Sequence, residues 1–140
     1  MPEVDTKPLN WKPAPNVGYT VARRPDGGMQ YTFKDTSPVT LEHWRAFALE
    51  HLLDSDRLTR NLYDLRQVEE ITEHAMKYAI EVSSDPSARN IRIAVVVSSE
   101  AARDAVEEIA ALTESGAEMA IFTSIPEAEA WLDRPLTLLV

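Results

Sequence analysis

The segment Asn61-Leu62-Tyr63-Asp64-Leu65-Arg66 decides the fold, because it predicts an apolar strand that ends in polar residues. An amphipathic helix is predicted over residues 71–80, directly after a short turn. The same plan then repeats: residues 91–97 (IRIAVVV) are typical of a strand buried on both faces, and a helix is predicted after them. A further buried strand is predicted over residues 117–123. Strands that alternate with helices predict parallel pairing through right-handed crossovers.

An antiparallel hairpin is predicted ahead of this segment. Residues 17–24 and 29–33 alternate apolar and polar side chains, and Pro25-Asp26-Gly27-Gly28 supplies a turn between them. Thr40 is predicted to cap a helix from Leu41 to about Asp54. Near the other end, Ser124-Ile125-Pro126-Glu127 matches a capping box and predicts a short last helix. We therefore predict an α/β fold with a single mixed β-sheet, an N-terminal antiparallel hairpin plus parallel strands, flanked by helices.

The length of 140 residues suits a single domain. Four prolines within residues 1–16 predict an extended arm, because proline lacks a backbone donor and fixes φ. The α/β domain is predicted over residues 17–140. Trp11 in the arm and the apolar end over residues 135–140 favour contact with a second copy, so we predict a homodimer.

Composition excludes several classes of function. The chain has no cysteine, which excludes disulfides, thiolate catalysis and cysteine-bound metals, and no metal or other cofactor is predicted. The net charge is −9, with nine acidic and two basic residues from residue 98 onward, and this disfavours nucleic-acid binding. No apolar run approaches the roughly 20 residues that span a bilayer, and no signal-peptide pattern is visible. A cytoplasmic location without a membrane span is predicted.

Ligands of open α/β sheets bind beyond the carboxyl ends of the strands. The helix N-termini at that edge also favour anions. The serines there have a second explanation as helix caps, and capping competes with ligand binding for the same hydroxyls. The candidate ligand-binding residues at this edge are Asp64, Arg66, Ser98, Ser99, Thr123 and Ser124.

Signatures of catalysis are missing. The chain contains no Gly-x-Ser-x-Gly elbow, no phosphate-binding P-loop and no His-Glu-x-x-His pair. Ser98, His74 and Asp64 supply the residue types of a hydrolase triad, but no spacing selects them. No catalytic residue is predicted, and a small enzyme remains an alternative only.

The order of elements resembles the SpoIIAA-like or STAS-like family over about residues 17–132. The resemblance lies in Leu62-Tyr63-Asp64-Leu65-Arg66, in the strand over residues 93–97, and in Ile121-Phe122-Thr123-Ser124 followed by Glu127-Ala128-Glu129-Ala130-Trp131-Leu132. It implies the mixed-sheet α/β fold. It also implies a non-catalytic binding or regulatory domain that acts through a protein partner or an apolar small ligand.

Two functional branches follow from the resemblance. In anti-sigma-factor antagonists it implies a phosphorylatable serine where a helix starts, yet no serine lies between Asn61 and Val82. Thr72 is the remaining hydroxyl of that type, and the surrounding glutamates would repel a phosphate, so a phospho-regulated switch is the alternative. The second branch is an apolar-ligand carrier. Its pocket would be lined by side chains that are more often plain core: Trp44, Phe47, Met76, Tyr78 and Trp131.

Overall fold

The computed structural model describes residues 15–24, 28–53, 59–84, 91–113 and 118–134. The elements, in chain order, are β1 (Tyr19–Arg23), β2 (Met29–Phe33), α1 (Pro38–Leu53), β3 (Thr59–Asp64), α2 (Glu73–Ser83), β4 (Ile91–Val96), α3 (Glu100–Leu112), β5 (Glu118–Phe122) and α4 (Ile125–Leu132). Their order is the predicted one. Most of the proline-rich arm and all of residues 135–140 lie outside the described residues, so the domain boundary and the homodimer stay predictions.

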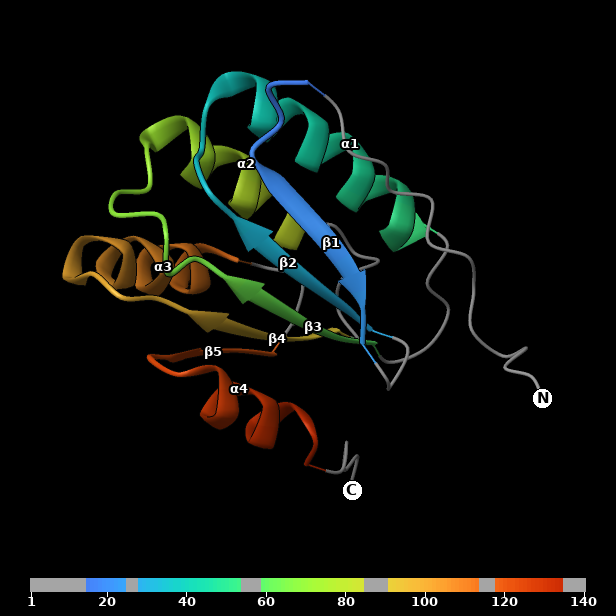
Figure 1. Ribbon diagram of the computed structural model, residues 1–140, viewed down its shortest axis with the longest axis vertical. Helices are drawn as coiled ribbons and strands as arrows, with labels where there is room; N and C mark the ends of the chain where they lie inside the picture. Colours follow the sequence, from blue (N-terminus) through green and yellow to red (C-terminus); the bar gives the residue numbers. More distant parts are fainter. Residues whose placement is uncertain (1–14, 25–27, 54–58, 85–90, 114–117, 135–140) are drawn as a thin grey trace.

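The strands form one mixed sheet in the order β1-β2-β3-β4-β5 (Figure 1). Strands β1 and β2 pair antiparallel, and every later pair is parallel, which confirms the predicted fold class. Tyr63 of β3 pairs with Tyr31 of β2 and with Val95 of β4, so it lies in the middle of the sheet.

Helices cover both faces of the sheet. Helices α1, α2 and α3 lie on one face, and α4 lies on the other (Figure 1). Because side chains alternate along a strand, Tyr63 faces the three helices, whereas its neighbour Leu62 packs beneath α4 against Leu132. No helix among the described residues is long and apolar enough to cross a membrane.

Two helix starts differ from the prediction. Helix α1 begins at Pro38, because proline suits the first helical position, and Leu41 N–H already bonds to the Ser37 carbonyl. Thr40 lies inside the first turn, fully buried, so the prediction that it caps the helix was wrong. Helix α2 begins at Glu73 with Thr72 as its N-cap, so Ile71 precedes the helix.

Candidate functional site

All six predicted ligand residues lie at the carboxyl edge of the parallel strands. Asp64 ends β3, and Ser98 and Ser99 follow β4. The Ser98 hydroxyl donates to the carbonyl of Arg66 at 2.7 Å, which ties the two strand ends together. Thr123 and Ser124 follow β5 at the same edge, where the Val97 N–H donates to the Phe122 carbonyl, and Ser124 caps α4, which covers the opposite face of the sheet.

Asp64 is buried, and Arg66 satisfies its carboxylate. The guanidinium donates to both carboxylate oxygens at 2.9 Å, and the Arg66 N–H donates to Oδ1 at 3.1 Å. Burial acts to raise the pKa of Asp64, but the hydrogen bonds and charge of Arg66 outweigh it, and the pKa lies below its usual value. The side chain of Arg66 remains 49% exposed.

The serines at this edge act as structural anchors. Ser99 Oγ accepts from Ala102 N–H as the N-cap of α3 and donates to the carbonyl of Glu69 at 2.7 Å. Ser124 Oγ accepts from Glu127 N–H. These hydroxyls have partners within the chain, so ligand binding by the six edge residues stays a prediction.

Thr72 has a defined structural role. Its hydroxyl oxygen accepts from Ala75 N–H at 3.1 Å, which satisfies a free donor in the first turn of α2. The residue is exposed, and Glu73 follows it at once. Modification of Thr72 stays a prediction.

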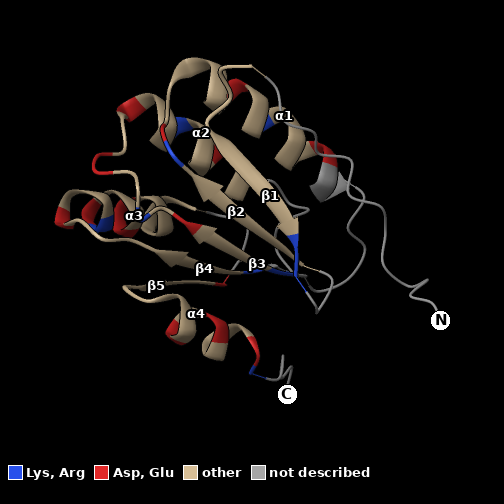
Figure 2. Cartoon of the chain, viewed as in Figure 1, with Lys and Arg blue, Asp and Glu red and all other residues tan. Residues whose placement is uncertain are grey.

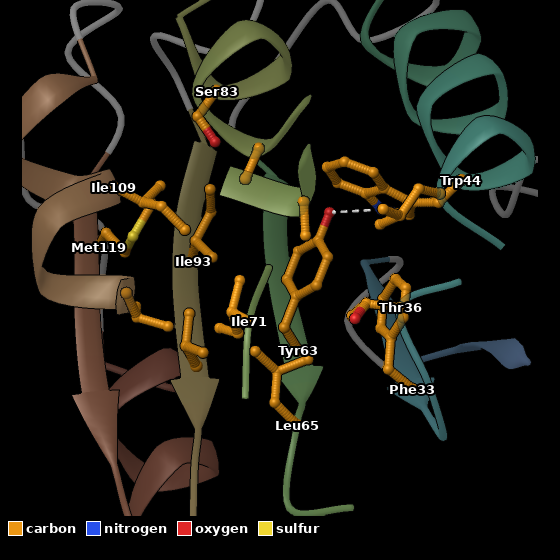
Figure 3. Close-up of a pocket in the computed structure, with 15 residues that line it drawn as sticks. Phe33, Thr36, Trp44, Tyr63, Leu65, Ile71, Ser83, Ile93, Ile109 and Met119 are labelled. Carbon is orange, nitrogen blue, oxygen red and sulfur yellow. Dashed lines mark hydrogen bonds between the residues drawn. The ribbon is translucent and has the colours of Figure 1, made fainter. Parts of the chain in front are cut away.

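A cavity of about 90 Å³ lies between the sheet and helices α1, α2 and α3 (Figure 3). Its lining residues come from β2 to β5, the three helices and two loops, and none is charged: Phe33, Thr36, Leu41, Trp44, Tyr63, Leu65, Ile71, Ala75, Ala79, Ser83, Ile93, Val95, Val106, Ile109 and Met119.

Small residues on α2 help to leave this space. Ala75, Ala79 and Ser83 are spaced four apart, so they share one face of the helix, and all three line the cavity. Helix α2 packs against α1 and α3 on either side. This spacing of small residues is visible in the sequence, but the predicted pocket residues were mostly large aromatic side chains.

Of the five side chains predicted to line a pocket, only Trp44 does so. Phe47 is buried against Tyr31 in the core. Trp131 lies on the far face of the sheet, where it contacts Phe122 and Arg92.

The other two predicted pocket residues, Met76 and Tyr78, lie on α2 and are absent from the cavity wall. The hydroxyl of Tyr78 donates to Glu42 instead. The prediction of Phe47, Met76, Tyr78 and Trp131 as lining residues was wrong, because periodicity does not show which apolar residues leave space between them.

Tyr63 is one of three residues with a hydroxyl group in the cavity wall. Its hydroxyl oxygen accepts a hydrogen bond from the indole Nε1 of Trp44 at 3.3 Å, drawn as the dashed line in Figure 3. The ring stacks on Tyr31, with centroids 4.4 Å apart. Burial raises the pKa of Tyr63 far above the usual value of a phenol, so the hydroxyl keeps its proton.

No charged residue of the described part of the chain lines the cavity. Figure 2 shows acidic residues on all of the helices and few charges within the strands. Within the described residues, no group of three or more acidic or histidine side chains is placed to hold a metal ion. The site is therefore an apolar cavity with hydroxyl groups in its wall.

A family model described as SpoIIAA-like matches residues 32–133, from the end of β2 to the residue after α4. No curated protein matches the chain. The family match covers the cavity and the carboxyl edge, and it spans most of the 140 residues. The chain belongs to the SpoIIAA-like family.

Proposed function

We propose that this protein is a non-catalytic binding domain that takes a small apolar molecule into the cavity beneath α2. The cavity itself carries the proposal. Protein interiors are close-packed and hold few voids larger than a water molecule. This cavity of about 90 Å³ opens in part to solvent, and the atoms of its wall lack packing partners on the side of the cavity. A bound guest restores those contacts.

The chemistry of the wall selects the guest. Twelve of the fifteen lining residues are aliphatic, aromatic or Met, and the other three, Thr36, Tyr63 and Ser83, have uncharged polar tips. Tyr63 and Trp44 also satisfy each other in part. An ionised guest would find no counter-charge in this wall, so its transfer from water into the cavity would be costly. The cavity is smaller than an engineered apolar cavity of about 150 Å³ that binds benzene, so it favours small neutral molecules.

A cavity-filling variant tests this function. Ala79→Leu adds three carbons from α2 towards the sheet, and Ala101→Leu adds the same carbons to the exposed start of α3 as a matched control. Titration of methylenecyclopentane, followed by amide chemical shifts, is expected to saturate for the wild type and for Ala101→Leu. Ala79→Leu is expected to stay folded, to gain stability by cavity filling, and to show no saturation. A wild type that does not saturate would contradict the proposal.

A role through a protein partner is the second candidate, and an open area of the sheet favours it. Helix α4 packs on β3, β4 and β5, and the same face of β1 carries the exposed residues Thr20 and Ala22. Pull-down from native extract with the wild type and with a Thr20→Arg, Ala22→Arg double variant tests this candidate. A partner retained by both proteins would not bind through this face.

A further inference from the structure

We propose that the Tyr63 hydroxyl donates a hydrogen bond to the guest, so that the cavity selects neutral apolar molecules that carry one acceptor oxygen. Small ketones and ethers belong to this class. The proposal rests on the proposed function, since it names the ligand class of the same cavity. It adds a polar anchor to a site otherwise defined by shape.

The hydrogen-bond pattern around Tyr63 leaves its proton available. Trp44 Nε1 donates to the Tyr63 oxygen, so that contact uses a lone pair and not the proton. The neighbouring Tyr31 hydroxyl lies 3.9 Å from the sulfur of Met29, a weak acceptor. Beside the larger effect of burial, a side-chain hydrogen bond between the two phenols acts to raise the pKa of Tyr31 and to lower that of Tyr63, so Tyr31 is the donor and the Tyr63 oxygen is the acceptor. Both contacts use lone pairs of Tyr63 and leave its proton, and of the two hydroxyls only that of Tyr63 belongs to the cavity wall.

An available proton at this position matters energetically. A buried donor without a strong acceptor keeps most of its desolvation cost. Because burial keeps Tyr63 protonated, the group meets a guest as a donor. Its position in the middle of the sheet, pointing away from the strands towards the helices in Figure 3, places the donor inside the apolar space.

Ser83 provides a second donor on the same cavity. The residue is buried near the end of α2, and its side chain is drawn towards the cavity in Figure 3. Among the described residues its hydroxyl has no hydrogen-bond partner, unlike Thr113 of the α3 C-cap, whose hydroxyl bonds to the Ile109 carbonyl. Thr36, the third hydroxyl, is partly exposed and can bond to solvent. The serine and threonine hydroxyls can accept as well as donate, so the preference for a guest with an acceptor rests on the Tyr63 proton.

A pair of isosteric probes tests the proposal. Cyclopentanone and methylenecyclopentane have the same shape, but only the ketone accepts a hydrogen bond. Dissociation constants of both probes are measured by amide shift titration for the wild type, for Tyr63→Phe and for Ser83→Ala. Tyr63→Phe is expected to lower the relative affinity for the ketone by about fivefold to tenfold and to leave that for the alkene nearly unchanged. Tyr78→Phe, which removes a phenol hydroxyl outside the cavity, is the matched control and is expected to match the wild type.

A second measurement needs no variant. The carbonyl stretch of cyclopentanone bound to the wild type is expected at a lower wavenumber than in hexane, because a donor weakens the C=O bond. A band at the hexane position would overturn the proposal even if Tyr63→Phe failed to fold.

The outcomes separate the two claims. If neither probe saturates the wild type, the proposed function fails and this proposal fails with it. If both probes saturate the wild type but Tyr63→Phe keeps the same ratio of affinities, the ligand class is wrong and the binding function stands. An equal loss of both probes in Tyr63→Phe would give the residue a structural role and would also overturn the proposal.

Discussion

Asp64 and Arg66 close the end of β3 on itself: Arg66 Nε lies 2.9 Å from one carboxylate oxygen of Asp64, and a terminal guanidinium nitrogen lies 2.9 Å from the other. The two residues are only two positions apart, and the Arg66 N–H completes the turn. The carboxylate is therefore satisfied from within the chain. This makes Asp64 a positioning group for the strand end, and half of the Arg66 side chain stays exposed to solvent.

Asp64→Asn is expected to lower the free energy of unfolding by about 1–2 kcal/mol at neutral pH. The reason is that the amide replaces the buried, negatively charged carboxylate that pairs with the Arg66 guanidinium. Urea unfolding measures the change. Glu107→Gln, in an exposed ion pair with Arg103, is the control and is expected to cost less than about 0.5 kcal/mol. Equal effects of the two substitutions would contradict a special role for Asp64.

The same pair predicts a pH dependence. The pKa of Asp64 is lower in the folded state than its usual value of 3.8, so the stabilisation is present above that value. It is lost as the pH falls through the lower folded-state pKa. The stability difference between the wild type and Asp64→Asn is therefore expected to shrink as the pH is taken below about 4. A difference that stays constant over that range would rule out the ionised pair as its source.

Thr72→Ala is expected to cost about 1 kcal/mol, because the N-cap of α2 loses its acceptor. Thr72→Asp is expected to cost much less, since aspartate is an equally good N-cap and adds a charge that the helix dipole favours. Thermal and urea unfolding of the two variants measure this. If aspartate is as damaging as alanine, repulsion by the neighbouring glutamates outweighs capping, and a phosphate at Thr72 would be disfavoured for the same reason.

Ser99→Ala is expected to destabilise the protein more than Ser98→Ala. Ser99 loses a cap to Ala102 and a bond to the Glu69 carbonyl, whereas Ser98 loses one bond, to Arg66. The expected costs are about 1.5 and 0.5–1 kcal/mol. Ser99→Thr keeps both functions of the hydroxyl and is expected to recover most of the loss. Equal costs for Ser98 and Ser99 would show that the cap adds nothing.

The architecture was predictable because strand and helix periods were clear. The run over residues 91–97 became β4, and the capping box at Ser124 became the start of α4. Helix α1 was misplaced by three residues, since a threonine before an apolar run looks like a cap. Thr40 instead serves a tertiary contact that the local pattern does not contain: it donates to Asp35 and accepts from Gly18.

The candidate site was predictable only in part. The six edge residues lie together as expected, because parallel strands place their carboxyl ends at one edge, whereas ligand binding by them stays a prediction. The cavity depends on the distance between α2 and the sheet, which small side chains on one helix face and the crossover geometry set together. The sequence placed Tyr63 in a strand but did not indicate its place in the cavity wall. Its hydrogen-bond partner Trp44 comes from α1, and only the packing of helix on sheet brings the two residues together.

Gly18 is expected to tolerate no side chain while Asp35 keeps its position. A Cβ on Gly18 would lie 2.0 Å from Asp35 Oδ2, and that carboxylate is held by hydrogen bonds from the Thr40 hydroxyl and the Ser37 N–H. Gly18→Ala is expected to cost about 1–3 kcal/mol, as overpacking does. Asp35→Ala alone is expected to cost about 1 kcal/mol for the lost hydrogen bonds. The double variant removes the clashing carboxylate, so its cost is expected to fall below the sum of the single costs by about 1 kcal/mol or more in urea unfolding. Strict additivity would mean that the backbone of Gly18, and not its close approach to Asp35, requires glycine.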